Sequence, residues 1–335
     1  MHGQSLEEAR AAGFAAPPPR KAQGPIVDVH THMTEPATNH ELIEAARLYR
    51  IATLVAIAPL DAGLALRGQY PREITLAVRP VLTEPRGQIA LLDRAVETVH
   101  GAKAHGAPLI KLWFAPRIRD RLDFLLDSPR LDPMFQAIAE TGLGVLVHVS
   151  DPDRWFERKY DPAKYGTKAE QYPMLETRLR QFPTIPFVAA HMGGDPEHLD
   201  HLADLLTRYP NLYLDTSATK WIVRELGRQR QAARDFFRRW ADRICFGTDQ
   251  VVLKDSEPVR YTMRYWVHQM FWETDLVCES PIADPDSDGV PSLRGLDLPV
   301  DVLEQIYWKT AAAAFGIRTR PSQNAPSIPL PNAGP

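Results

Sequence analysis

The chain has 335 residues, of which 44% are hydrophobic and 24% charged, and its formal net charge is −3. This is the composition of a globular domain, and it offers no basic surface for the phosphates of a nucleic acid. No segment approaches the roughly 20 apolar residues that cross a bilayer. The 2 cysteines are too few for a disulfide framework. We therefore expect a cytoplasmic protein that acts on a small molecule, with neither nucleic acid nor a membrane as partner.

Residues 1–24 differ in composition from the rest of the chain. They contain early acidic residues and three consecutive prolines at 17–19, and they lack the apolar segment of a secretory signal. Proline has no backbone donor and favours an extended chain. We predict that residues 1–24 are a flexible extension outside the core, that residues 25–317 form the folded domain, and that residues 318–335 are a proline-rich tail.

Short runs rich in Val, Ile and Leu alternate with segments of helical periodicity through the predicted domain. Such alternation is typical of parallel strands that helices cover on the outer face. Eight alternations in one chain favour a closed barrel, so we predict an α/β fold of the (β/α)8, or TIM barrel, type. The predicted strands are 26–29, 53–57, 74–81, 109–113, 144–148, 187–190, 212–215 and 244–247. The predicted helices include 88–105, 133–141, 175–182, 196–209 and 228–240.

Two segments interrupt this alternation. Residues 151–173 form a loop insertion after the fifth strand, and loops of this length are commonly functional. Residues 279–295, rich in Pro, Asp and Ser, separate a predicted helix at 257–277 from a last helix at 300–314. The aromatic residues of the 257–277 helix could contribute to the core or to a contact in a homo-oligomer, and core packing is the interpretation we favour.

The strongest chemical signal is the pair His30 and His32 at the end of the first strand. Alternation along a strand puts both imidazoles on the same side of the backbone. The carboxyl end of a barrel strand is also where the active sites of this architecture lie. An exposed polar pair without function is the alternative interpretation.

Polar residues close three further apolar strands. His148 ends the fifth strand, His191 follows the sixth, and Asp249 follows the eighth. A single buried histidine often has a structural role, but polar residues at several strand ends are hard to explain by packing alone. Three imidazoles and one carboxylate suit Zn²⁺, with Fe²⁺, Mn²⁺ or Co²⁺ as alternatives. Zinc can lower the pKa of a bound water from about 15.7 to about 7, which provides a nucleophile at neutral pH.

The sequence resembles the amidohydrolase superfamily, within it the amidohydrolase-related branch of aminocarboxymuconate semialdehyde decarboxylase-like enzymes. The resemblance spans residues 24–317. It rests on VDVHTH, LIKLWF, SPRLDPMFQAIAETGLGVLVH, FVAAHMGG, NLYLDTS and CFGTD, in this order. The closing helix departs from the family pattern, since Lys309, Thr310 and Ala311 stand where many members have a G-N-A signature.

The resemblance assigns roles residue by residue. It implies that His30, His32, His148 and Asp249 bind one metal ion, and that Asp249 also takes a proton from the attacking water. It implies that His191 stands just outside the ligands and acts as acid, base or electrophile toward the substrate.

Lys111 lies within an apolar strand, where a lysine needs a modification or an anionic partner. A carboxylated Lys111 would bridge two metals, as in some superfamily members. The alternatives are a contact with a substrate carboxylate or a nearby acid, and a lysine that reaches solvent. We favour one metal.

Candidate substrate contacts are Trp113 at the end of the fourth strand and Arg154 and Trp155 on the 151–173 loop. Solvated loop charge explains Arg154 equally well. Polar residues that close the seventh strand could line the pocket, although helix capping accounts for some of them as well. These residues are Asp215, Thr216, Ser217 and Lys220.

Two reactions fit these residues. The first is hydrolysis of an ester, lactone or amide carbonyl in a small, carboxylate-bearing substrate by a metal-activated water. The second is metal-dependent, non-oxidative decarboxylation of a small aromatic or unsaturated acid, in which Arg117, Arg119 or Arg154 would hold the carboxylate. A non-catalytic binding barrel is the third and weakest hypothesis.

Overall fold

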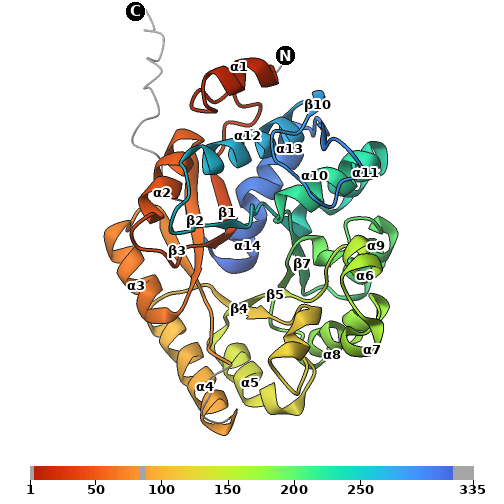
Figure 1. Ribbon diagram of the computed structural model, residues 1–335. Helices are drawn as coiled ribbons and strands as arrows, with labels where there is room; N and C mark the ends of the chain where they lie inside the picture. Colours follow the sequence, from red (N-terminus) through yellow and green to blue (C-terminus); the bar gives the residue numbers. More distant parts are fainter. Residues whose placement is uncertain (1–3, 83–87, 320–335) are drawn as a thin grey trace, which may run out of the picture.

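The computed structural model describes residues 4–82 and 88–319, and its centre is a barrel of parallel strands (Figure 1). Neighbouring strands follow the order β8-β7-β6-β5-β4-β3-β2-β1-β9, and every pair is parallel. The strands are β1 (Ile26–His32), β2 (Ile51–Ala58), β3 (Ile74–Val78), β4 (Leu109–Trp113), β5 (Gly144–His148), β6 (Phe187–Ala189), β7 (Leu212–Asp215), β8 (Ile244–Cys245) and β9 (Gln250–Val251).

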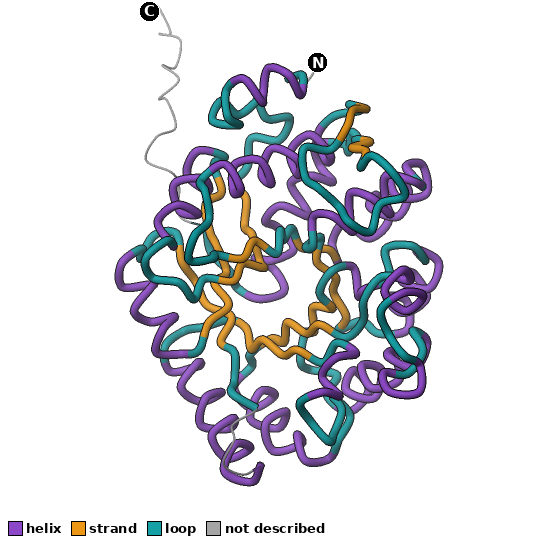
Figure 2. The backbone as a smooth tube through the Cα atoms, in the orientation of Figure 1, coloured by secondary structure: helices purple, strands orange, loops and turns teal. Residues whose placement is uncertain are grey.

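The last two strands are two halves of one barrel strand. The backbone between β8 and β9 still bonds to β1, from the Val29 amide to the Phe246 carbonyl at 2.9 Å and from the Asp249 amide to the His30 carbonyl at 2.9 Å. β9 then pairs with the end of β1. The ring of strands therefore closes, as Figure 2 shows, and the predicted (β/α)8 barrel is confirmed.

Helices surround the ring of strands on its outside (Figure 2). Most lie where the sequence predicts them, with ends that differ by a few residues. They are α2 (Asn39–Leu48), α3 (Leu60–Gln69), α4 (Gln88–Ala104), α5 (Asp132–Thr141), α8 (Tyr172–Gln181), α9 (Leu199–Arg208), α10 (Thr219–Arg228), α11 (Arg230–Trp240), α12 (Val259–Glu273), α13 (Val300–Glu304) and α14 (Thr310–Phe315). A π-helical turn, Gln305–Lys309, joins α13 to α14.

Alternation along the strands separates two apolar regions. Val55, Leu109, Leu146 and Val188 lie in the cluster that fills the barrel, whereas their neighbours on each strand lie in the larger cluster that includes the helices. The aromatic residues of α12, among them Trp266 and Trp272, are buried in the larger cluster. Among the described residues, every helix is too short or too polar to cross a membrane.

Part of the N-terminal segment packs on α12, which differs from the expectation that residues 1–24 lie outside the core. A short helix, α1 (Leu6–Ala11), precedes Phe14, whose ring lies 5.5 Å from that of Trp266. The Gln269 side-chain amide donates to the Pro18 carbonyl at 2.9 Å. The buried ring of Phe14 supplies an apolar contact with the domain. The prediction, which depended on the proline content, did not take this residue into account. The domain boundaries themselves stay a prediction, and residues 320–335 of the predicted tail lie outside the described residues.

The two unusual loops lie over the same end of the barrel and contact each other. The 151–173 loop contains α6 (Asp153–Arg158), α7 (Pro162–Tyr165) and a 3₁₀ turn, Ala169–Gln171. The second loop contains an antiparallel hairpin of β10 (Val277–Glu279) and β11 (Ser292–Arg294). Arg154 joins the two loops through hydrogen bonds to Asp286 and Asp288.

Candidate active site

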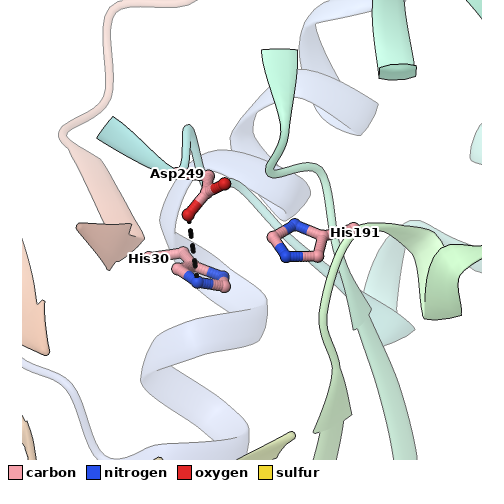
Figure 3. Close-up of side chains that lie close together, drawn as sticks. All are labelled: His30, His191 and Asp249. Carbon is pink, nitrogen blue, oxygen red and sulfur yellow. Dashed lines mark ion pairs between the residues drawn. The ribbon is translucent and has the colours of Figure 1, made fainter. Parts of the chain in front are cut away.

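Three side chains converge at the carboxyl end of the barrel strands (Figure 3). His30 comes from β1, His191 follows β6, and Asp249 lies between β8 and β9. One donor atom of each lies within 4.8 Å of the others. The convergence follows from the fold, because the ends of parallel strands that are far apart in sequence meet at one mouth of the barrel.

The local backbone departs from regular strand geometry at each of these residues. In β1 the register with β2 shifts between Asp28 and Thr31, which inserts an extra residue before the site. His191 has a φ of 60° and Asp249 a φ of 56°, in the left-handed region that non-glycine residues seldom adopt. Nearby, Gly194 has a φ of +72°, and a Cβ there would lie 2.1 Å from the Ser150 carbonyl oxygen. Only glycine fits that position.

Asp215 orients His30. The His30 Nδ1–H donates to Asp215 Oδ2 at 2.8 Å, and both side chains are fully buried. Burial lowers the pKa of His30 to about 4, which favours the neutral imidazole. Burial alone would raise the pKa of Asp215, but the adjacent His30 brings it well below its usual range. Nε2 of His30 is therefore left without a proton, the form in which it can bind a metal, as in other carboxylate–histidine–metal arrangements.

Ser217 extends this arrangement to His191. The Ser217 hydroxyl donates to Asp215 Oδ1, and the Ser217 Oγ lies 2.7 Å from His191 Nδ1. The hydroxyl proton is already committed, so His191 Nδ1–H is the donor in that contact. The backbone amide of His191 also donates to Asp215 Oδ1, at 2.8 Å. Burial lowers the pKa of His191 well below its usual value, so both histidines are held neutral with Nε2 unprotonated.

His32 and Asp249 lie at the solvent side of this group. His32 Nε2 is 3.2 Å from Asp249 Oδ1, and His30 Nε2 is 3.5 Å from the same oxygen. Burial would raise the pKa of Asp249, but its contact with His32 and the nearby imidazoles bring that pKa far below its usual value. Asp249 is thus a carboxylate at neutral pH, and 28% of its side chain is exposed.

His148 lies next to His191 and outside the group of His30, His191 and Asp249. Its ring centroid lies 4.5 Å from that of His191, while its Nε2–H faces the Ser150 carbonyl and Asp151 Oδ1, each at 3.1 Å. The Tyr160 hydroxyl donates to the other Asp151 oxygen at 2.5 Å. The structure thus brings His191, rather than His148, into the group with His30 and Asp249, and ligation by His148 stays a prediction.

Lys111 is buried inside the barrel next to His30. Its side chain does not reach solvent, since the residue is 3% exposed. Its Nζ lies 3.2 Å from His30 Nε2, the nitrogen that would bind a metal. Burial lowers the pKa of Lys111 to about 8, although the carboxylates of Asp215 and Asp249 oppose that shift. Lys111 therefore adjoins the group, and the choice between a metal bridge and a substrate contact stays a prediction.

Asp28 fastens β1 to the turn that carries Asp249. It accepts hydrogen bonds from the Thr248 amide at 3.0 Å and from the Thr248 hydroxyl at 2.6 Å. The His30 amide donates to it at 3.2 Å. Burial raises the pKa of Asp28 to about 7. The sequence interpretation gave Asp28 no role, although a carboxylate inside an apolar strand, two residues before a histidine, was a signal for one.

The predicted substrate contacts have different surroundings. The Arg154 guanidinium donates to the Asp286 carbonyl at 2.6 Å and to Asp288 at 2.7 Å, so it joins the two long loops. Trp155 donates from Nε1 to Asp286 at 2.8 Å. Trp113 lies beside His148, with ring centroids 6.5 Å apart. Substrate contact by these three residues stays a prediction, and the structure gives Arg154 another partner.

Trp221 is a site residue that the sequence interpretation missed. Its ring lies 5.4 Å from His191, 6.4 Å from His148 and 5.0 Å from Trp155. It follows Asp215 by six residues, in the first turn of α10. Its position six residues after the end of the seventh strand, next to Lys220, was the available signal.

The chain belongs to the amidohydrolase family. The family model described as amidohydrolase matches residues 64–317, which is more than half of the chain. His30 and His32 precede that range. The predicted membership of this superfamily is confirmed, and the chain is an enzyme of the amidohydrolase superfamily. A search of curated proteins finds no significant match.

Solved structures with the same fold include an uncharacterised TIM-barrel protein from Bordetella bronchiseptica. It is 17% identical over 88% of this chain and 99% of that chain, with a TM-score of 0.56. A probable 2-pyrone-4,6-dicarboxylic acid hydrolase from Acinetobacter baumannii, with citric acid bound, is 12% identical over 88% and 100%, with a TM-score of 0.51. The 5-carboxyvanillate decarboxylase of Novosphingobium aromaticivorans, complexed with manganese and a nitrobenzoic acid, is 15% identical over 82% and 79%, with a TM-score of 0.50. At these identities the likeness concerns the fold.

Proposed function

We propose that this enzyme is a metal-dependent hydrolase that opens an ester, lactone or amide bond in a small, carboxylate-bearing substrate. The observation that carries the proposal is the group of His30, His191 and Asp249 within 4.8 Å at the barrel mouth. Two imidazole nitrogens and a carboxylate oxygen suit Zn²⁺, and Mn²⁺, Fe²⁺ or Co²⁺ would also fit. The bond from His30 to Asp215 supports the same interpretation.

A bound divalent metal would supply a Lewis acid and lower the pKa of water at the site. The chain's own residues would do the rest. Asp249, ionised at neutral pH, would accept the proton of the attacking water and pass it to the leaving group. His191, neutral and held by Ser217, would bind the metal through its unprotonated Nε2 or, if His32 and His148 are the ligands, would accept a hydrogen bond from the attacking water at that nitrogen. The water oxygen forms the new bond to the carbonyl carbon, and the bond from that carbon to oxygen or nitrogen breaks.

The remaining ligands are part of the proposal. The family resemblance favours His32 and His148 beside His30 and Asp249, whereas the distances favour His191. Metal content of His148→Asn and His191→Asn separates the two possibilities, because the variant that lacks a true ligand binds less metal at equal protein concentration. One metal equivalent supports the single-metal hypothesis, and two equivalents would support a carboxylated Lys111 as a bridge.

Non-oxidative decarboxylation is the second candidate. The fold is shared with a decarboxylase as well as with a probable hydrolase. The buried Lys111 ammonium, 3.2 Å from His30 Nε2, could hold a carboxylate beside the metal ligands. In this reaction the bond to the carboxylate carbon breaks, CO2 leaves, and a proton from the site replaces it.

One experiment distinguishes the two reactions. The purified enzyme, reconstituted with Zn²⁺ or Mn²⁺, is incubated with carboxylated lactones and esters and, separately, with hydroxylated aromatic acids. Hydrolysis releases a proton and no CO2, while decarboxylation releases CO2. Turnover that disappears in Asp249→Asn supports the site. Absence of both reactions together with absence of bound metal would overturn the proposal.

A further inference from the structure

Three basic side chains lie on two helices that start at the barrel mouth. Lys220 lies in the first turn of α10, directly after β7, and Arg260 and Arg264 lie one turn apart near the start of α12. The Arg264 guanidinium donates to the Arg260 carbonyl at 3.1 Å. The charge of Asp249 acts on Arg264, which places this arginine within electrostatic reach of the site.

Hydrogen bonds fix the two helices relative to the turn that carries Asp249. The Thr219 Oγ1 lies 3.2 Å from the Thr248 carbonyl and 3.0 Å from Nε2 of His268. Thr219 precedes Lys220, and His268 follows Arg264 by one turn of α12. The start of α10, the middle of α12 and the site turn are therefore held together, and the basic group, defined as Lys220, Arg260 and Arg264, has a fixed relation to Asp249.

None of the three cations has an ion pair within the part of the chain that the structure describes. Burial, followed by the charges of Arg264 and Arg260, lowers the pKa of Lys220. Burial and the charge of Arg260 likewise lower the pKa of Arg264 to about 10. The Arg260 Nε is buried and has no hydrogen-bond partner. Cations so close together repel each other, and partial burial without a counter-ion adds to the cost.

The nearby carboxylates are already engaged elsewhere. Asp284 binds Arg224, Asp286 binds Trp155 and Lys159, and Asp249 faces His30 and His32. The first turn of a helix also disfavours a positive charge, and both Lys220 and Arg260 lie in first turns. By contrast, Arg154 and Arg178 elsewhere in the protein each have a carboxylate partner. An anion from outside the chain would satisfy the basic group.

We propose that the basic group binds a carboxylate of the substrate and so selects acids over their neutral counterparts. The inference rests on the proposed function for the reacting end of the substrate, and it identifies the residues that hold the other end. Two guanidinium groups and an ammonium suit a carboxylate, to which arginine can donate two parallel hydrogen bonds. The position of Arg264 near Asp249 sets this carboxylate beside, and not at, the bond that reacts.

The kinetic test uses a carboxylated ester or lactone and the corresponding methyl ester, in which the same carboxylate is neutralised. In Arg264→Gln and Lys220→Gln we expect KM for the acid to rise about 10- to 100-fold, since a hydrogen bond to a charged group contributes about 1.5–3 kcal/mol. We expect kcat to change little, and KM for the methyl ester to stay the same. Arg264→Lys should recover part of the loss, and Arg238→Gln, exposed on α11, serves as the matched control.

A binding test separates this inference from the proposed function. Calorimetric titration of the metal-loaded enzyme with benzoate, benzamide and inorganic phosphate requires no turnover. Tighter binding of benzoate than of benzamide, reduced about tenfold in Arg264→Gln, supports the subsite even if no reaction is found. Preference for phosphate would overturn the assignment to a carboxylate. Hydrolysis with an unchanged ratio of KM values for acid and methyl ester in a folded Arg264→Gln variant would overturn the subsite and leave the proposed function intact.

Discussion

Two clusters of histidine and carboxylate side chains in the described residues have donor atoms close enough to hold a cation. One is the inner group of His30, His191 and Asp249, and the other is an outer group of Asp153, Asp195 and His198. In the outer group the Lys168 ammonium lies 2.6 Å from Asp153 and 2.8 Å from Asp195, so a cation of the chain already satisfies it.

The lysines that adjoin the two groups have opposite surroundings. Burial would lower the pKa of Lys168, but the carboxylates of Asp195 and Glu197 outweigh burial and raise it. At Lys111 burial outweighs the carboxylates, and the pKa falls to about 8. The outer group is therefore a closed network of ion pairs, while the inner group keeps unprotonated imidazole nitrogens. Proximity of donor atoms is therefore not sufficient for a metal site. The balance of charge around the donors distinguishes the inner group from the outer group.

The largest expected effect separates the two groups by metal content and activity. His30→Ala should abolish stoichiometric metal binding, and Asp249→Asn should lower kcat by about a thousandfold or more, because it removes the proton acceptor. His198→Ala, the control from the outer group, should keep both. Elemental analysis and initial rates provide the measurement. Retention of full metal content in His30→Ala would contradict the inner site.

Removal of Lys168 should affect stability and leave chemistry unchanged. Lys168→Met leaves Asp153, Asp195 and Glu197 facing one another without a cation, and loss of one partner of a buried network costs about 3–5 kcal/mol. Urea unfolding of the wild type and variant measures the difference. Lys164→Met, an exposed lysine of the same loop, should cost little. A large fall in metal content of Lys168→Met would show that the outer group takes part in the site.

Asp215→Asn should weaken metal binding without unfolding the barrel. The carboxylate fixes Nδ1–H of His30 and, through Ser217, of His191, and loss of such a partner typically lowers metal affinity about 10- to 100-fold. Competition with a chromophoric chelator measures the dissociation constant. Asp200→Asn, exposed on α9, is the control. Unchanged affinity in Asp215→Asn would mean that packing alone orients His30.

The smallest expected effect concerns the pH dependence of stability that a buried histidine outside the site produces. Burial lowers the pKa of His268 to about 3, and this residue belongs to neither group. In the unfolded chain this histidine has an ordinary pKa near 6.5 and binds a proton below that pH, whereas in the folded state it stays neutral. Stability therefore falls as the pH drops below about 6.5.

Between pH 7 and pH 5 this histidine should account for about 2 kcal/mol of lost stability. Urea unfolding of metal-free His268→Gln at both pH values should show a smaller loss than in the wild type. An equal loss in His268→Gln and the wild type would contradict a neutral His268.

The sequence by itself was sufficient for the barrel and for the position of His30, His191 and Asp249 at one mouth of it, although it predicted His148, and not His191, as the ligand beside His30 and Asp249. Both follow from local pattern, because apolar runs define parallel strands and the residues that end such strands must lie at one mouth. The pairing of His30 with Asp215, the engagement of Arg154 by Asp288 and the packing of Phe14 on Trp266 were not predictable in this way. Each joins residues more than 100 positions apart, and their distance depends on the closed barrel and its loops.

The sequence and the tertiary structure likewise each determine part of the chemistry of the site. Residue type and strand position determined which side chains could bind a metal. The tertiary structure decided the protonation of those side chains and which cations have partners, since burial and neighbouring charge set pKa values and ion pairs. That is why Arg154, a candidate from the sequence, has its own partner. Arg260 and Arg264, which local pattern did not single out, have no ion pair in the described structure, and the charge of Asp249 acts on Arg264.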